Sequence, residues 1–232
     1  MPQGYNPIKV VRQSGKRSRI PDILTPGEIS SLGHGSAKRD RAMMSIEYGN
    51  GLRISEGIGI KWHDIDFEKC VAMVNQSVVK GHVGATKNEV SKKLVPLHEY
   101  QIEDLKAWRS VAPYPEDDAW VFASDHSRVK GRKPYWPDAI LTHHIRPLAT
   151  KLGVNKRIGW HTFRRTFSSL LTQNGENVSV VQELMRHANP QTTLRLYSQA
   201  NAEHLRGAQS RVMDMVRAAR PVTAEPEILN VQ

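Results

Sequence analysis

The chain has 232 residues and a formal net charge of +10, from 33 Lys and Arg against 23 Asp and Glu. This length suits one sizeable domain with an arm and a tail, and the positive excess favours a polyanionic partner. A single cysteine, Cys70, excludes an internal disulfide and a cysteine-rich zinc site, and no apolar run is long enough to span a membrane. We therefore expect a soluble, cytoplasmic protein.

The N-terminal part is predicted to be a basic arm followed by helices. Residues 1–20 are basic with scattered Gly, Pro and Ser, which is typical of a flexible arm. Thr25 and Glu28 form a capping box around Pro26, so a helix starts there. Two more helices are expected, over 37–48 and 52–60.

The pattern changes between residues 70 and 97. VAMVNQSVV is β-branched and extended, GHVGATKNEV is rich in turn residues, and KKLVPL reads as a returning strand. We expect a small antiparallel sheet here, the only clear one in the chain. The predicted fold class is α+β, a predominantly helical domain with a small antiparallel sheet.

Helices return in the second half. One is expected at 99–110 and, after a short strand at 121–124, another at 138–152, where Pro147 should kink or shorten it before Gly153 ends it.

Three further helices are predicted toward the C-terminus. Thr162 is the expected N-cap of a helix that runs to about Gln173, and a capping box opening at Ser179 starts one that reaches His187. Asn189 and Pro190 cap another, and 202–219 form an amphipathic helix ahead of a disordered tail at 220–232.

Four segments carry residues suited to phosphate chemistry. HTFRR places His161 and Arg164 near a helix start, where backbone N–H groups favour an anion. The structural alternative is a capping histidine and an arginine paired with a core carboxylate. GNGLRISEG places Arg53 one turn before Glu56, which could equally be an ordinary surface ion pair.

The other two segments carry a lysine and an aromatic residue. GATKNEV places Lys87 in the loop of the sheet, where a solvated lysine is the alternative interpretation. MRHANPQTTLRLY places His187 ten residues before Tyr197, an aromatic that would otherwise be expected in the core.

Read in chain order, these segments resemble the catalytic domain of the tyrosine recombinases, the phage integrase family. The family pattern is an Arg in a GLR-S-E segment, a hairpin Lys, His-x-x-Arg, a His or Trp, and a nucleophilic Tyr. The resemblance covers roughly residues 22–200, and the matching positions are Arg53, Lys87, His161, Arg164, His187 and Tyr197.

The resemblance implies a site-specific DNA recombinase that requires neither a metal ion nor ATP. Tyr197 attacks the scissile phosphate to give a 3′-phosphotyrosyl link, and Arg53 and Arg164 neutralise the charge of the transition state. Lys87 is the implied general acid, and His161 the acid/base partner of the tyrosine.

The remaining implied roles are supporting ones. His187 hydrogen-bonds a non-bridging oxygen, and Glu56 supports the arginines. Arg165 and Arg186 are assigned to DNA binding. The implied partners are double-stranded DNA, other protomers in a tetramer on paired sites, and an accessory protein. The implied location is the nucleoid.

The sequence departs from the family in three places. Arg165 stands where a histidine is frequent, and Met185 and Arg186 where Leu-Gly is frequent. Residues 21–219 are expected to be the catalytic domain, and the N-terminal domain that clasps the other face of DNA is expected to be absent. The chain is then either a catalytic fragment or a naturally short recombinase.

Three other functions remain open at this stage. A type IB topoisomerase uses the same chemistry but religates the same strand, and a DNA-binding module could have lost catalysis. A metallohydrolase could use His143, His144 and His161, but no HExxH motif or clustered carboxylates accompany them.

Overall fold

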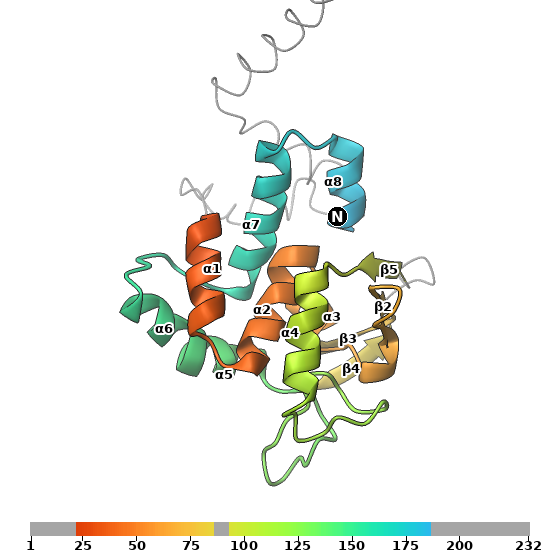
Figure 1. Ribbon diagram of the computed structural model, residues 1–232. Coiled ribbons are helices and arrows are strands. Elements are labelled where there is room, and N and C mark those ends of the chain that lie inside the picture. Colours follow the sequence, from red (N-terminus) through yellow and green to blue (C-terminus); the bar gives the residue numbers. More distant parts are fainter. Residues whose placement is uncertain (1–21, 86–92, 187–232) are drawn as a thin grey trace, which may run out of the picture. The chain divides into compact units, whose positions relative to one another are not determined.

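The computed structural model describes residues 22–85 and 93–186, which form an α+β fold of helices with two small antiparallel sheets (Figure 1). The predicted fold class is confirmed. The arm at 1–20, the helix at 202–219 and the tail lie outside the described residues. In chain order the elements are α1 (Pro26–Gly35), α2 (Lys38–Asn50), α3 (Ile54–Gly57), η2 (Trp62–Asp64), β1 (Ile65–Asp66), β2 (Val71–Val74), β3 (Gln76–Val79), β4 (His82–Ala85), β5 (Lys93–Pro96), α4 (Glu99–Arg109), α5 (Pro137–Ile140), η4 (Leu141–Ile145), α6 (Arg146–Lys151), α7 (Trp160–Gln173) and α8 (Val178–Leu184).

The helix α2 lies at the centre of the first half, with α1 and α4 packed against it (Figure 1). The capping box predicted for α1 is confirmed, since Thr25 N donates to Glu28 and Glu28 N donates to the Thr25 hydroxyl. Burial of apolar side chains drives this packing. Side chains of the core in this region include Leu32, Met43, Met44, Ile46 and Leu105.

A tight turn joins α2 to α3. Gly51 ends α2 with φ of 57°, the left-handed region that glycine adopts at little cost. Asn50, just before it, donates to the Pro96 carbonyl and accepts from the Gln101 amide of α4. The turn that precedes Arg53 is therefore fixed by contacts from β5 and α4.

The helix predicted over 52–60 is shorter, because its last part meets the sheet. Gly59 lies so close to β3 that a Cβ there would be 2.9 Å from the Gln76 carbonyl oxygen. Gln76 in turn donates its amide to the Gly59 carbonyl at 2.9 Å. The chain stops coiling at Gly57 and runs past the strand instead.

The region of the predicted sheet contains two sheets, not one. The strands β1, β2 and β5 form the first, and β3 and β4 form a separate hairpin, all antiparallel. The segment His82–Ala85, which we expected to be turn, is the strand β4. Gly84 has a low strand propensity, which made a strand hard to predict here. Pairing with β3 nevertheless holds the segment extended.

Of two predictions for residues 121–152, the strand is wrong and the interruption of the helix near Pro147 is confirmed. The strand expected at 121–124 is replaced by isolated bridges from Trp120 to Lys61 and from Ala123 to Pro134. The helix expected at 138–152 is interrupted by the π-helical turn η4, after which Pro147 sits in the first turn of α6. A proline there has no N–H to continue an α-helical ladder, so the preceding turn widens.

The helix α7 begins earlier than predicted. Thr162 is not its N-cap but lies in its first turn, where the Thr162 hydroxyl accepts from Gly159 N and donates to the Arg157 carbonyl. His161 is consequently inside the helix and not ahead of it. One turn later, the buried Thr166 hydroxyl accepts from the backbone N–H of Leu24 at 2.9 Å.

The described chain divides into two compact units at Thr166, inside α7. The second unit contains the rest of α7 and α8. Asn177, not Ser179, caps α8, because its side chain accepts from Ser179 N at 2.9 Å. The helix ends at Leu184, short of the predicted end at His187.

Candidate active site

Arg53 and Glu56 form one half of the site, at the start of α3. Glu56 accepts the backbone N–H of Arg53 at 2.8 Å through one carboxylate oxygen and its guanidinium at 3.2 Å through the other. The Arg53 side chain is 47% exposed, whereas that of Glu56 is 10% exposed. The carboxylate therefore orients a guanidinium that remains accessible at the surface, and the supporting role of Glu56 stays a prediction.

Arg164 connects this half to α7. Its guanidinium donates to the carbonyl oxygen of Gly51, two residues before Arg53, and Arg164 is only 8% exposed. A guanidinium has five N–H donors in a fixed fork, so one bond to the turn leaves others for different acceptors. The contact brings two arginines together that are far apart in the sequence.

His161 lies one turn before Arg164 on α7 and shares the same electrostatic environment. Burial is the largest cause that lowers the pKa of His161, followed by the positive charges of Arg165, Arg164 and Arg53. Each cause disfavours the imidazolium form. The imidazole is thus neutral at neutral pH and able to accept a proton, and the residues predicted from two motifs share one site.

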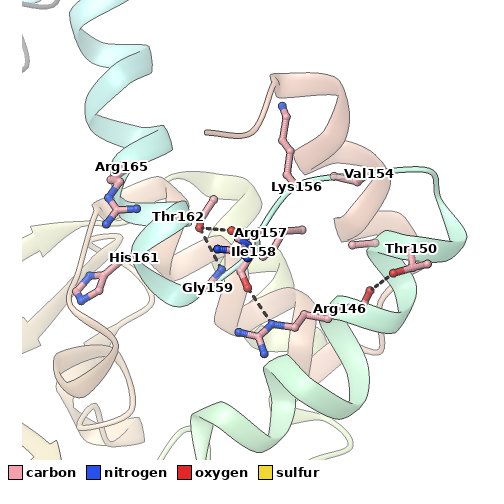
Figure 2. A pocket seen from close by; sticks show the side chains of 11 residues that line it. Arg146, Thr150, Val154, Lys156, Arg157, Ile158, Gly159, His161, Thr162 and Arg165 are labelled. Atoms are coloured by element: carbon pink, nitrogen blue, oxygen red, sulfur yellow. Dashed lines mark hydrogen bonds between the residues drawn. The ribbon is translucent and has the colours of Figure 1, made fainter. Parts of the chain in front are cut away.

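A cleft of about 650 Å³ opens beside His161 (Figure 2). It is formed by α6, the loop after it and the first turn of α7. The lining side chains are mostly polar or basic, and the basic ones include Arg146, Lys156, Arg157, His161 and Arg165.

The basic side chains of the cleft are not equivalent. Arg146 Nε donates to the Ile158 carbonyl at 2.9 Å, and Lys156 forms an ion pair with Glu28 at 2.6 Å. Arg157 and Arg165 are exposed. Of the arginines that line this cleft, the sequence interpretation had singled out Arg165 but not Arg146 or Arg157, although the basic run KRIGWHTFRR includes the last of these.

The other predicted site residues are not among those that the described part of the chain brings together. Lys87 lies between β4 and β5, outside the described residues, and so do His187 and Tyr197. Arg186 follows α8 in the second unit, with φ of 51°. Their assigned roles stay predictions.

The histidines of the metallohydrolase alternative are not gathered into a metal site. His144 Nδ1 lies 3.1 Å from the buried carboxylate of Asp40. Within residues 22–85 and 93–186, no three His, Cys, Asp or Glu side chains are grouped to hold a metal ion. In the same ranges, no helix is long and apolar enough to cross a membrane.

The family of this chain follows from its match to the model of a known protein family. The model of the phage integrase family matches residues 22–204, which include both motifs of the site described above. The chain belongs to the phage integrase family. The resemblance seen in the sequence is confirmed.

Relatives of this phage integrase family member are tyrosine recombinases. A tyrosine recombinase of Pseudothermotoga lettingae is 35% identical over 191 residues, and the match covers 81% of this chain and 60% of the relative. XerA of Thermococcus onnurineus is 28% identical over 198 residues, with 83% and 63% covered. The chain thus spans less than two thirds of the length of these relatives.

Solved structures show the same fold. A crystal structure of XerA recombinase matches with a TM-score of 0.63 and 23% identity, over 88% of this chain and 66% of that one. The Tn1549 transposon integrase in complex with a circular intermediate DNA matches with a TM-score of 0.68 and 21% identity, over 90% and 70%.

Proposed function

We propose that this chain carries out the DNA cleavage and rejoining of a site-specific recombinase. The supporting observation is that Arg164 of α7 bonds to the Gly51 carbonyl, two residues before Arg53, and that the charges of both arginines act on His161. Membership of the phage integrase family supports it as well. Two guanidiniums beside a neutral imidazole fit a phosphodiester, because the arginines bind the oxygens and the imidazole takes a proton.

The proposed cleavage reaction uses Arg53, His161 and Arg164 together with Lys87 and Tyr197, which lie outside the described residues. The Tyr197 oxygen attacks the scissile phosphorus while His161 accepts its proton. The bond to the 5′-oxygen breaks, and Lys87 supplies a proton to that oxygen. The products are a 3′-phosphotyrosyl link and a free 5′-hydroxyl, so the phosphate ester is conserved for religation.

The arginines contribute through charge. The five-coordinate transition state gathers negative charge on the non-bridging oxygens, which Arg53 and Arg164 neutralise with forked hydrogen bonds. His187 is proposed to bind one of the same oxygens. Because Glu56 and Gly51 already hold the two guanidiniums, little reorganisation is needed when the phosphate arrives.

The basic cleft is proposed to bind the DNA backbone next to the scissile phosphate. Its exposed arginines adjoin His161, and the first turn of α7 presents backbone N–H groups there. Arg186 is proposed to add a further contact. Strand exchange needs two DNA sites, so we propose that protomers assemble as a tetramer on paired sites at the nucleoid.

Trapping of the covalent intermediate tests this function. The full chain is incubated with nicked duplexes of randomised sequence, quenched with detergent, and the protein-linked DNA is sequenced. We expect an adduct joined through a 3′-phosphate, with a common sequence, that disappears in Tyr197→Phe while DNA binding persists. An adduct that survives in Tyr197→Phe would assign the nucleophile elsewhere.

The selected sequence then separates recombinase from topoisomerase. Two plasmids that carry it should exchange strands in the presence of the wild-type chain. Relaxation of a supercoiled plasmid without any exchange would support the type IB topoisomerase alternative. Binding without any adduct would support a DNA-binding module.

A further inference from the structure

Glu47, on α2, is a buried carboxyl group that the mechanism above does not use. It is 1% exposed, and neither of its oxygens has a hydrogen-bond partner in the described part of the chain. Burying a carboxylate without compensation is far more costly than burying a neutral carboxyl. The position of Glu47 therefore calls for a reason other than fold stability.

The carboxyl group lies directly against α3. A Cβ added to Gly57 would be 2.5 Å from Glu47 Oε1, so a larger residue there would require the carboxyl group to move. Gly57 follows Glu56, whose carboxylate orients Arg53. Glu47 thus lies against the short helix α3, whose start carries Arg53 and Glu56.

Charges from two elements act on Glu47. The pKa of Glu47 lies well above its ordinary value because of burial first and the Glu56 carboxylate second, while Arg164 on α7 opposes the shift. The neutral form therefore predominates over its ionised form well into the range where an ordinary glutamate is charged.

Charged groups on the other helices beside α2 have partners of their own. Asp104 of α4 forms an ion pair with Arg41, and Glu28 of α1 forms one with Lys156. Neither contributes to the shift at Glu47. After burial, which raises the pKa of Glu47 most, the charged groups that act on it are Glu56 and Arg164, both part of the site.

We propose that Glu47 is a positioning residue that acts on phosphate binding through Arg164: neutral, it leaves the guanidinium charge to the DNA, and ionised, it competes with the phosphate for that charge. This inference rests on the proposed function, in which Arg164 binds the scissile phosphate. The physical basis is that a carboxylate and a phosphate compete for the same donor. The proton on Glu47 then sets how strongly the site holds DNA.

A salt titration of DNA binding tests the proposal. The slope of log affinity against log salt counts the phosphates that the protein neutralises, at about −0.9 for each. With a short duplex of arbitrary sequence, we expect the wild-type slope to become shallower by about one phosphate as pH rises through the ionisation of Glu47. Glu47→Gln, which stays neutral, should keep the same slope across that range.

The control variant is Asp104→Asn, which removes a carboxylate that also faces α2 but is paired with Arg41. It should retain the wild-type change of slope. A slope that changes with pH equally in wild type and Glu47→Gln would overturn the proposal, because another group would then be responsible.

A second measurement needs neither DNA nor catalysis. The carboxyl carbons of wild-type glutamates are followed by NMR across pH, with ¹³C-labelled glutamate. One resonance should titrate well above the others, and its midpoint should fall when Glu56→Gln removes the neighbouring negative charge. If every glutamate titrates in the ordinary range, the proposal is wrong, whereas the proposed recombinase function would stand.

Discussion

Arg164 donates a hydrogen bond to the carbonyl oxygen of Gly51, a residue 113 positions earlier and two before Arg53. A single contact therefore ties the helix of the His-x-x-Arg motif to the turn that carries the other arginine. Gly51 can offer its carbonyl in this direction because of its left-handed conformation. The relative placement of the two guanidiniums depends on this contact.

Arg164→Lys should reduce covalent adduct formation by about two to three orders of magnitude, the effect typical of losing one preorganised donor at a developing oxyanion. Lysine keeps the charge but cannot bind Gly51 and a phosphate with one planar fork. Adduct yield after a fixed time measures this. Arg165→Lys, the exposed neighbour, is the control and should change the yield little. Equal loss in both would mean that a guanidinium matters at either position, and that the contact to Gly51 is not what distinguishes Arg164.

His161 should be able to act as a base at a lower pH than an ordinary histidine, because its pKa lies below 6.5. Burial and three nearby guanidiniums lower its pKa, so the neutral form appears at lower pH than for an ordinary histidine. Arg165→Gln removes one of these charges and should raise the pKa, moving the acid limb of the cleavage-rate profile to higher pH. NMR titration of the imidazole checks the shift directly. Arg157→Gln, whose charge is not among the causes, should leave it unchanged.

Lys87→Ala should be rescued by a substrate in which sulfur replaces the 5′-bridging oxygen at the scissile phosphate. A thiolate leaves without a proton, so a general acid becomes unnecessary. Arg164→Ala should stay inactive on the same substrate, because it loses binding of the non-bridging oxygens. Cleavage rates on the two substrates give the ratio for each variant. Rescue of Lys92→Ala instead, at the first lysine that follows the predicted turn, would assign the acid to Lys92.

Arg157→Gln should make the salt dependence of DNA binding shallower by about one phosphate. Arg157 is exposed in the cleft and free to meet the DNA backbone through its side chain. The matched control is its neighbour Lys156, which is engaged with Glu28, so Lys156→Gln should change the slope less. Fluorescence anisotropy of a short duplex over a range of salt concentrations measures both. An equal change would place the DNA across both residues.

Gly57→Ala should destabilise the fold by about 1–3 kcal/mol, the range for overpacking a buried site. The added methyl would meet Glu47 Oε1 at 2.5 Å, a distance that requires movement. In a Glu47→Ala background the same change should cost much less, because the oxygen is gone. Urea denaturation of the four proteins gives the coupling energy. Additive effects would show that Glu47 and Gly57 are not in contact.

Sequence signals predicted helix and strand boundaries well where the hydrogen bonds behind the signal join residues close together in the chain. The capping box at Thr25 and Glu28 is an example, since both of its hydrogen bonds join neighbours in the chain. Thr162 misled because its hydroxyl is used by the preceding loop, at Arg157 and Gly159, instead of by a helix N-terminus. A capping side chain and a loop-binding side chain look alike in sequence.

The candidate site was predictable as a set of residues but not as a geometry. The motifs gave Arg53, Glu56, His161 and Arg164, and the structure brings them into one site. The bond from Arg164 to Gly51 could not be predicted, because it joins distant segments through a backbone atom that has no sequence signal. Glu47 had a weak signal: it is a charged residue beside Ile46 and one turn from Met43 in a buried helix.

The buried hydroxyl of Thr166 has a mechanical consequence. It accepts the backbone N–H of Leu24 at 2.9 Å, less than one turn of α7 beyond Arg164. A load applied to the chain ahead of residue 22 would reach the helix of His161 and Arg164 through this bond, without passing through α1 or α2. Thr166→Val, which keeps the shape but loses the acceptor, would remove this hydrogen bond between the incoming chain and the helix of His161 and Arg164.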